Sequence, residues 1–527
     1  MIRAAPSPTT SGRPRSAVAR SPAVTAAVLG LLATVLAGIG SWSVSLWSDE
    51  TATISAASRS PDDLWRLLGH IDAVHGTYYA LMNTWVGVFG ASPFSLRLPS
   101  ALTVGVATSG VYVLMRRLDP RAAVWAAVAF ALLPRVTWAG IEARPSAFGI
   151  ALAVWLTVVL HQAVTGGSRR LYAVYAVLLA LAVAANVYVA LIAAAHGVTL
   201  LVRPRLRRAL PAFTAAAVSG ALLVTPLLRV VLGQGGQLGE ADRGLLGTAR
   251  NVAVNQWFLG ETPTPTTDSG ARLVLADPGD VAWKLAAVAL ALSCWLLVAR
   301  AVAAVPGEGS PSRADLLAWT VPWLVIPTLL VLLGSLASPA LYNARYLGFC
   351  APAVAMLVAA GATSLTRRPA VAVSVVLLVL VAPVYHSQRT VSAKSGTDWA
   401  QVADLLEERT APGDGVYFGP REDPRDGTVL RSLRTVSIAY PGPFEGLTDV
   451  TLVASPEEGA TLFGTSGTLD AHLDRLERID TLWVLRRQDR PVDAAAEDAL
   501  LRDAGFRVLE VWDLPRTQVL ELTRGGR

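Results

Sequence analysis

Residues 23–50 read AVTAAVLGLLATVLAGIGSWSVSLWSDE, an apolar run that ends on two carboxylates, Asp49 and Glu50. About 20 consecutive apolar residues suffice to cross a bilayer as a helix. The stretch therefore predicts a membrane-spanning first helix with the carboxylate pair at its outer end. A cleaved signal peptide is the alternative, because basic residues precede the run. The run is longer than the apolar core of a usual signal peptide, however, and no clear A-x-A cleavage site follows it.

The composition also favours a membrane protein. Of 527 residues, 53% are hydrophobic and 16% are charged, whereas soluble domains carry about 25% charged residues. The net charge of +6 comes from arginines between apolar runs, which fits membrane topology better than a nucleic-acid surface. The two cysteines, Cys294 and Cys350, and the scattered histidines give no disulfide framework and no local metal-ligand spacing.

Apolar segments recur along the chain, and the positive-inside rule orients them. With the N-terminus in the cytoplasm, the arginine clusters between segments fall on the cytoplasmic side. We therefore predict about eleven transmembrane helices within a domain of residues 21–386, preceded by a disordered cytoplasmic segment, residues 1–20. The predicted spans are 23–46, 95–115, 122–140, 146–164, 171–186, 188–202, 211–231, 281–303, 315–336, 346–365 and 370–385.

Three further regions are predicted to lie outside the membrane. Residues 48–94 and 233–280 form long outer loops. Within the first loop, Tyr78–Gly90 is apolar but too short to span, and its Tyr and Trp content suits an interfacial or re-entrant helix. In residues 387–527 charges become frequent, and short apolar runs alternate with helical patterns, which predicts a small extracytoplasmic α/β domain. The apolar runs are 416–418, 481–485 and 506–512, and the helical patterns are 398–410 and 494–505. No phosphate-binding loop accompanies these runs, so nucleotide binding has no support.

Several carboxylates are predicted to lie at the outer face. Asp49 and Glu50 are the first candidates for chemistry, because ionisable residues at membrane depth are usually functional. Two solvated carboxylates at a helix end are the structural alternative. Asp72 and His75 precede a tyrosine pair in the first outer loop.

Arginines are predicted to join them at the same face. Arg345 starts the tenth span on the outer side and so breaks the positive-inside pattern, which makes it the arginine most in need of a functional reason. Arg97, near the outer end of the second span, could instead be a snorkelling side chain. Glu142 and Arg144 mark the outer turn between the third and fourth spans, where an internal ion pair is the alternative.

Carboxylates and arginines on one membrane face suit the displacement of a lipid phosphate from a sugar carbon. A carboxylate takes the proton of an acceptor hydroxyl, while arginines hold the phosphate and stabilise the charge that develops on it. A phosphate leaving group needs no proton, so the acid that a glycosidase uses is dispensable. Nucleotide sugars are cytoplasmic, so an outward-facing transferase requires a lipid carrier.

Four sequence blocks, in this order, resemble the GT-C superfamily of glycosyltransferases, close to glycosyltransferase family thirty-nine. That family includes protein O-mannosyltransferases and lipid A aminoarabinose transferases. The blocks are LWSDETATISAA (46–57), HGTYYALMNTWVGVFGASPFSLRLPSAL (75–102), GIEARPSAF (140–148) and NARYLGFCAPAV (343–354). The stretch DWAQVADLLEERTAPGDGVYF (398–418) also resembles the soluble tail of bacterial members.

The resemblance implies an inverting transferase that uses a polyprenyl-phosphate sugar, with Asp49 as the base and Glu50 beside it. Arg345 would contact the lipid phosphate, with Arg97 and Arg144 as weaker candidates. The substrate-binding candidates are His75, Tyr78, Tyr79 and Glu142. Members often read H-x-P-x-Y-Y where this chain has His75-Gly76-Thr77-Tyr78-Tyr79, which leaves the loop geometry open.

The resemblance does not name the substrates. Mannose is the default sugar, and the acceptor is a protein, a lipid or a glycan. No cofactor or metal ligand is identified, and a divalent-metal requirement stays open. Two other classes also remain open: a transporter of lipid-linked saccharides, and an inactive scaffold for envelope assembly. A transporter should place its cationic groups along a path through the membrane and show paired, broken helices, and the sequence contains no internal repeat.

Overall fold

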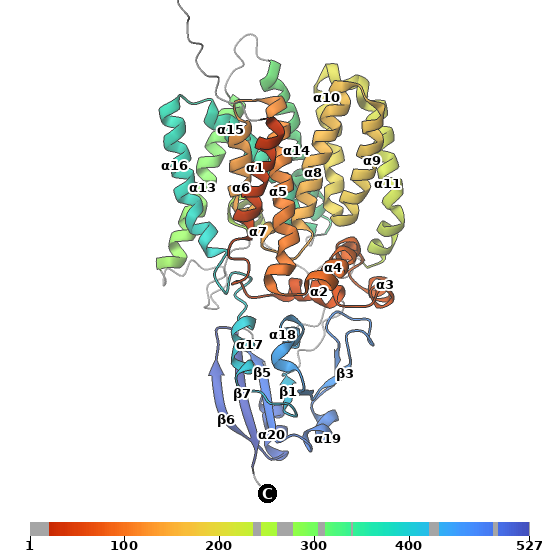
Figure 1. The fold of residues 1–527 in the computed structure, drawn as a ribbon, viewed down its shortest axis with the longest axis vertical. Helices are drawn as coiled ribbons and strands as arrows, with labels where there is room; N and C mark the ends of the chain where they lie inside the picture. Colours follow the sequence, from red (N-terminus) through yellow and green to blue (C-terminus); the bar gives the residue numbers. More distant parts are fainter. Residues whose placement is uncertain are drawn as a thin grey trace, which may run out of the picture.

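The computed structural model describes residues 21–234, 244–260, 278–303, 311–338, 341–420, 432–488 and 494–525. The predicted disordered segment 1–20 and most of the predicted outer loop 233–280 lie outside these residues. A bundle of long helices occupies one end of the molecule and a small α/β domain the other, with three short helices, α2, α3 and α4, between them (Figure 1).

The bundle helices match the predicted spans in position. Their outward surfaces carry exposed apolar side chains such as Leu222, Leu292 and Val379, as expected where lipid replaces water. The helices are α1 (Pro22–Gly38), α5 (Pro93–Leu118), α6 (Ala123–Leu132), α7 (Pro134–Gly140), α8 (Ser146–Gly166), α9 (Arg169–Ala185), α10 (Leu191–Val202), α11 (Leu210–Gly233), α13 (Pro278–Ala303), α14 (Pro311–Ser335), α15 (Ala351–Thr363) and α16 (Arg367–Ser387).

Among the described residues, seven helices are long and apolar enough to cross a membrane alone, or up to eight if a bent pair counts as one span. The bent pair is α6 and α7, which meet at 62° where Leu133 precedes Pro134, a residue that cannot continue the preceding helix. Shorter helices, including α1, α9 and α10, occupy the other predicted spans. The polytopic helical fold is therefore confirmed, while the count of eleven spans stays a prediction.

The position of the carboxylate pair differs from the prediction. The first helix ends at Gly38, not beside Asp49, and an irregular segment of residues 39–47 follows it. Asp49 and Glu50 lie in the first turn of a separate helix, α2 (Ser48–Ala57). Residues 39–47 carry no charge, which hid the break, but Gly40 and the alternation of serine with apolar residues over 41–46 are typical of extended chain rather than helix.

Two more short helices follow α2 in the first outer loop. These are α3 (Pro61–His70), which Ser60 caps by accepting from the Asp63 amide, and α4 (Gly76–Phe89). α4 matches the short helix predicted at Tyr78–Gly90. Its exposed Val88 and Phe89 suit the predicted interfacial position.

The C-terminal domain contains a five-stranded mixed sheet in the order β2-β1-β5-β7-β6. The predicted apolar runs form β1 (Gly415–Phe418), β5 (Thr481–Arg487) and β6 (Phe506–Asp513). The predicted helical patterns form α17 (Trp399–Glu407) and α20 (Ala495–Asp503), and Gly505 follows α20 at φ +90°. Four strands were not predicted from the sequence: β2 (Thr448–Asp449), β7 (Thr517–Arg524), and the hairpin of β3 (Leu452–Ala454) and β4 (Thr465–Ser466).

The α/β domain is packed onto the short helices. One buried apolar cluster includes Ile54 of α2, Met82 of α4 and Leu96 of α5 together with residues of the C-terminal domain. The domain's contributions include Val436 of α18 (Thr435–Ala439) and Leu462. The domain therefore shares a core with the helix that carries Asp49.

Candidate active site

Asp49 is the accessible carboxylate of the pair. Its side chain is 25% exposed, and Oδ2 lies 2.6 Å from Nη1 of Arg345, whose side chain is 22% exposed. In the first turn of α2 the positive end of the helix dipole also favours a carboxylate. Burial raises the pKa of Asp49, but Arg345 and Arg144 outweigh burial and hold the pKa at about 2. Asp49 is therefore ionised at neutral pH.

Arg345 is fixed by its local sequence. The side chain of Asn343 caps the short helix Ala344–Cys350 and accepts from the Arg345 amide at 3.2 Å. The guanidinium lies 5.7 Å from the ring centre of Trp47 and 5.6 Å from that of Tyr346. These aromatic faces stabilise the cation and hold it beside Asp49.

Arg144 connects Asp49 to the first outer loop. Its Nη1 donates to the Asp49 carbonyl at 3.3 Å and to the Tyr79 hydroxyl at 3.1 Å, and its Nη2 lies 2.8 Å from Nε2 of His75. The Tyr79 hydroxyl donates in turn to Asp72 at 2.7 Å. Arg144 is therefore oriented by α2 and the first outer loop, rather than by the local ion pair with Glu142 that the sequence allowed.

His75 is neutral in this arrangement. An arginine can only donate, so Nε2 of His75 accepts from Arg144 and the ring proton lies on Nδ1. Burial and the neighbouring Arg144 lower the pKa of His75 to about 3. His75 therefore orients Arg144 and does not carry charge at neutral pH.

Glu50 and Arg97 lie apart from this accessible site. Both side chains are fully buried, and Arg97 donates from Nε and Nη2 to the two Glu50 oxygens at 2.8 and 2.5 Å. Its remaining N–H groups donate to the carbonyls of Ser41, Val44 and Ser45. The five donors of the guanidinium are all used. The structure thus leaves Arg97 no free donor for a phosphate, unlike the sequence expectation.

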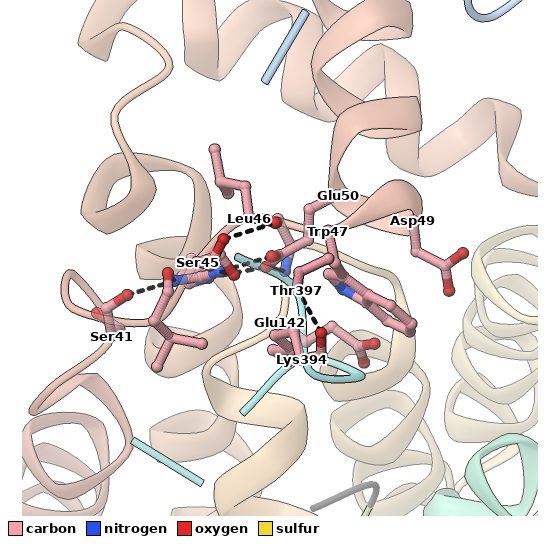
Figure 2. A network of polar contacts seen from close by, with 12 residues as sticks. Ser41, Ser45, Leu46, Trp47, Asp49, Glu50, Glu142, Lys394 and Thr397 are labelled. Carbon is pink, nitrogen blue, oxygen red and sulfur yellow. Dashed lines mark hydrogen bonds and ion pairs between the residues drawn. The ribbon is translucent and has the colours of Figure 1, made fainter. Parts of the chain in front are cut away.

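Glu50 is correspondingly a structural carboxylate in this geometry. Burial raises its pKa, but the ion pair with Arg97 outweighs burial, and the net pKa is lowered. Its Oε1 also accepts from the Ala143 amide at 2.9 Å. Figure 2 shows Asp49 directed away from this buried network, so the two neighbouring carboxylates face different surroundings.

The other two substrate-binding candidates are buried. Tyr78 is 2% exposed and packs edge-on against Phe148, with ring centres 5.6 Å apart. Glu142 is 1% exposed, and its carbonyl accepts from Ser100 at 2.7 Å. Tyr79 is also fully buried, and its hydroxyl is occupied by Arg144 and Asp72. Direct contact of Tyr78, Tyr79 or Glu142 with a substrate therefore has no geometric support in this structure.

Lys394 is a buried cation near the site that was not among the residues predicted from the sequence. It is fully buried, and its Nζ lies 3.7 Å from the ring centre of Trp138 and 6.0 Å from that of Trp47. Its charge helps to lower the pKa of Glu50, and Figure 2 draws it beside Trp47 and Glu142. Lys394 is one of two lysines in a chain whose cations are otherwise arginines. The rarity of lysine was the one feature of the sequence that could have drawn attention to Lys394.

The side chains of Asp49, Arg345 and Arg144 could support the transfer of a group from a phosphate carrier to a hydroxyl. An ionised carboxylate lies against one arginine and near a second, which provides a proton acceptor beside two anion-binding groups. Among the described residues, no group of three or more His, Cys, Asp or Glu could hold a metal ion.

Known proteins resemble the chain in both sequence and fold. Residues 77–230 match the model of a family described as dolichyl-phosphate-mannose-protein mannosyltransferase. The fold is similar to that of ArnT from Cupriavidus metallidurans bound to undecaprenyl phosphate, with a TM-score of 0.54 and 13% identity over 95% of this chain and 98% of that one. The chain has the fold of the GT-C superfamily.

A second solved structure has a similar fold. ArnT in the apo state gives a TM-score of 0.52 at 12% identity, over 95% of this chain and 98% of that one. No curated protein sequence matches the chain significantly. The GT-C resemblance read from the sequence is therefore confirmed at the level of the fold. Within that fold, Asp49, Arg345, Arg144 and His75 form the accessible group.

Proposed function

We propose that this protein is a membrane glycosyltransferase that moves a sugar from a polyprenyl-phosphate carrier to an acceptor hydroxyl. The observation that carries the proposal is the half-buried pair of Asp49 and Arg345, with Arg144 beside it. The pair sets a proton acceptor next to a group suited to the donor phosphate. The family matched over residues 77–230 and the GT-C fold support the same reaction class.

In this mechanism Asp49 takes the proton from the acceptor hydroxyl. The acceptor oxygen forms a bond to the anomeric carbon as the bond from that carbon to the phosphate oxygen breaks. The electron pair leaves with the lipid phosphate, whose charge Arg345 and Arg144 stabilise. A single displacement inverts the anomeric centre, and no acid is needed because phosphate is a good leaving group.

The donor class follows from the site and its relatives. An ArnT structure contains undecaprenyl phosphate, and the matched family is described by dolichyl-phosphate-mannose. Mannose on a polyprenyl phosphate is therefore the first donor to test. The acceptor is a protein, lipid or glycan in the cell envelope. The arginine pattern of the sequence predicts that the site and the C-terminal domain lie on the extracytoplasmic side of the plasma membrane.

The test supplies the purified protein with radiolabelled polyprenyl-phosphate sugars in vesicles that contain envelope lipids, glycans and proteins. We expect one label to move into a new glycosidic bond, together with release of polyprenyl phosphate. Movement of intact donor between leaflets without a new bond would instead identify a transporter. A transporter would need cationic groups along a path through the bundle, whereas Asp49, Arg144 and Arg345 gather in one accessible group.

A further inference from the structure

The segment Ser41–Trp47, which connects α1 to α2, is held on one side by the helical bundle. Its carbonyls at Ser41, Val44 and Ser45 accept from the buried Arg97. Arg97 also holds Glu50, so one side chain fixes both the connecting segment and the first turn of α2. Figure 2 shows this network, with Asp49 projecting away from it.

The same segment is held on its other side by residues from the C-terminal part of the chain. The Ser45 amide donates to the Val391 carbonyl at 2.9 Å, and the Leu46 amide donates to the Tyr440 hydroxyl at 2.9 Å. The Ala400 amide, at the start of α17, donates to the Ser45 hydroxyl at 3.2 Å. We call the segment Ser41–Trp47 the strap. It is hydrogen-bonded on both sides, although it belongs to no regular helix or strand.

Tyr440 is well placed to act on Asp49 because it follows α18, which packs on α2. The Leu46 amide that it accepts from lies three residues before Asp49. At the other end of α2, the Ser55 hydroxyl donates to the Leu462 carbonyl at 2.5 Å, and Arg59 donates to the Thr461 carbonyl. The C-terminal domain therefore holds α2 at both ends.

We infer that Tyr440 is a positioning residue for Asp49, and that the C-terminal domain completes the active site by fixing the strap before α2. The inference rests on the proposed transferase function. Asp49 must meet both Arg345 and the acceptor hydroxyl, and a shift of a fraction of an ångström in a reacting group reduces the rate of transfer. A domain that only recruited the acceptor would have no need of bonds to this strap.

The test is Tyr440→Phe, which removes one oxygen and leaves the ring. Tyr417→Phe is the matched control, because Tyr417 is a buried tyrosine of the same domain that packs in a separate core. We expect Tyr440→Phe to lower kcat about fivefold to tenfold, the scale of one lost hydrogen bond, with the KM for donor unchanged. The control should retain the wild-type kcat. Equal kcat in the two variants would overturn the inference.

Hydrogen–deuterium exchange provides a readout that does not depend on activity. In wild-type protein the Leu46 amide is bonded to Tyr440, so peptides covering residues 41–50 should exchange slowly. Tyr440→Phe should speed exchange in these peptides, and Tyr417→Phe should not. If the wild type transfers no sugar but this difference is seen, the proposed function fails and the positioning role stands. Unchanged exchange in Tyr440→Phe would refute the positioning role whatever the activity.

A second variant tests the strap from its own side. Ser45→Ala removes the hydroxyl that accepts from Ala400 and should lower kcat with the same unchanged donor KM. The Tyr440 and Ser45 side chains also interact directly, and both hold the strap, so the double variant should lose less than the product of the two single losses. Fully independent losses would show that Tyr440 and Ser45 act on different parts of the molecule.

Discussion

Asp49 and Arg345 form an ion pair of 2.6 Å although 296 positions separate them in the chain. The pair has a consequence for the order of events. While Arg345 contacts Asp49, the pKa of Asp49 is about 2 and the carboxylate is a weak base. A donor phosphate that draws Arg345 to itself weakens this contact and makes Asp49 more basic. Donor binding should therefore prepare the base for the acceptor.

Asp49→Asn should abolish sugar transfer. The amide keeps the size of the side chain but cannot accept the hydroxyl proton, so the loss should be at least about 100-fold. Transfer is measured with the radiolabelled donor, and donor binding is measured separately. Asp62→Asn, the same change at an exposed carboxylate of α3, is the control. Normal turnover by the Asp49→Asn variant would remove Asp49 as the base.

Arg345→Ala should weaken donor binding and change the pH profile. Without the arginine, the pKa of Asp49 rises from about 2 toward its ordinary 3.8. Because a carboxylate is active when ionised, the acid limb of kcat/KM should move to higher pH. In the wild type, the stabilisation from this pair is present above about pH 3.8 and is lost as the pH falls toward 2. An unchanged donor affinity would argue against phosphate binding by Arg345.

Arg97→Met should destabilise the fold rather than act on donor affinity. It leaves Glu50 buried without its cation, which costs about 3–5 kcal/mol. Thermal unfolding in detergent measures the loss. The double variant Glu50→Gln with Arg97→Met should recover part of it, because no buried charge remains. If the Arg97→Met protein folded normally and only its KM for donor rose, Arg97 would instead be a ligand of the donor phosphate.

His75 should contribute no ionisation near pH 6.5 to the activity profile. Its pKa is lowered to about 3, so the ring stays neutral from about pH 4 to 8. The unfolded chain binds the proton more readily, so this residue makes the fold more stable as the pH rises from 3 to 6.5. His75→Gln, which keeps an acceptor for Arg144, should be more active than His75→Leu. Equal activities would show that the bond to Arg144 is unimportant.

A cysteine introduced at Glu457 should react with a membrane-impermeant thiol reagent on intact cells. Glu457 is exposed in the C-terminal domain, and the positive-inside rule predicts that this domain is extracytoplasmic. The native Cys294 and Cys350 are buried and should label little in the unmodified control. Labelling only after lysis would reverse the predicted orientation.

Much of the fold could be predicted from the sequence because membrane spans are long, continuous apolar segments. The same reasoning located the small α/β domain from short alternating runs. The end of α1 at Gly38 was not predicted, because residues 39–47 carry no charge, although Gly40 and the alternating serines are a signal of extended chain. The different roles of Arg97 and Arg345 were not predicted either. Counting arginines by membrane side cannot tell a guanidinium enclosed by carbonyls from one that faces an open site.

The polytopic helical class is encoded in the apolar segments of the chain, and the positive-inside pattern predicts that Asp49, Arg144 and Arg345 lie at one end of the bundle. Which carboxylate of the Asp49-Glu50 pair faces the accessible site depends on packing between distant parts of the chain. Successive residues of a helix point about 100° apart. α2 is buried on all sides from Glu50 to Ala57, so only its first turn leaves Asp49 beside Arg345 while Glu50 is enclosed against Arg97. This packing depends on the bundle and on the C-terminal domain, whose residues are distant in the chain.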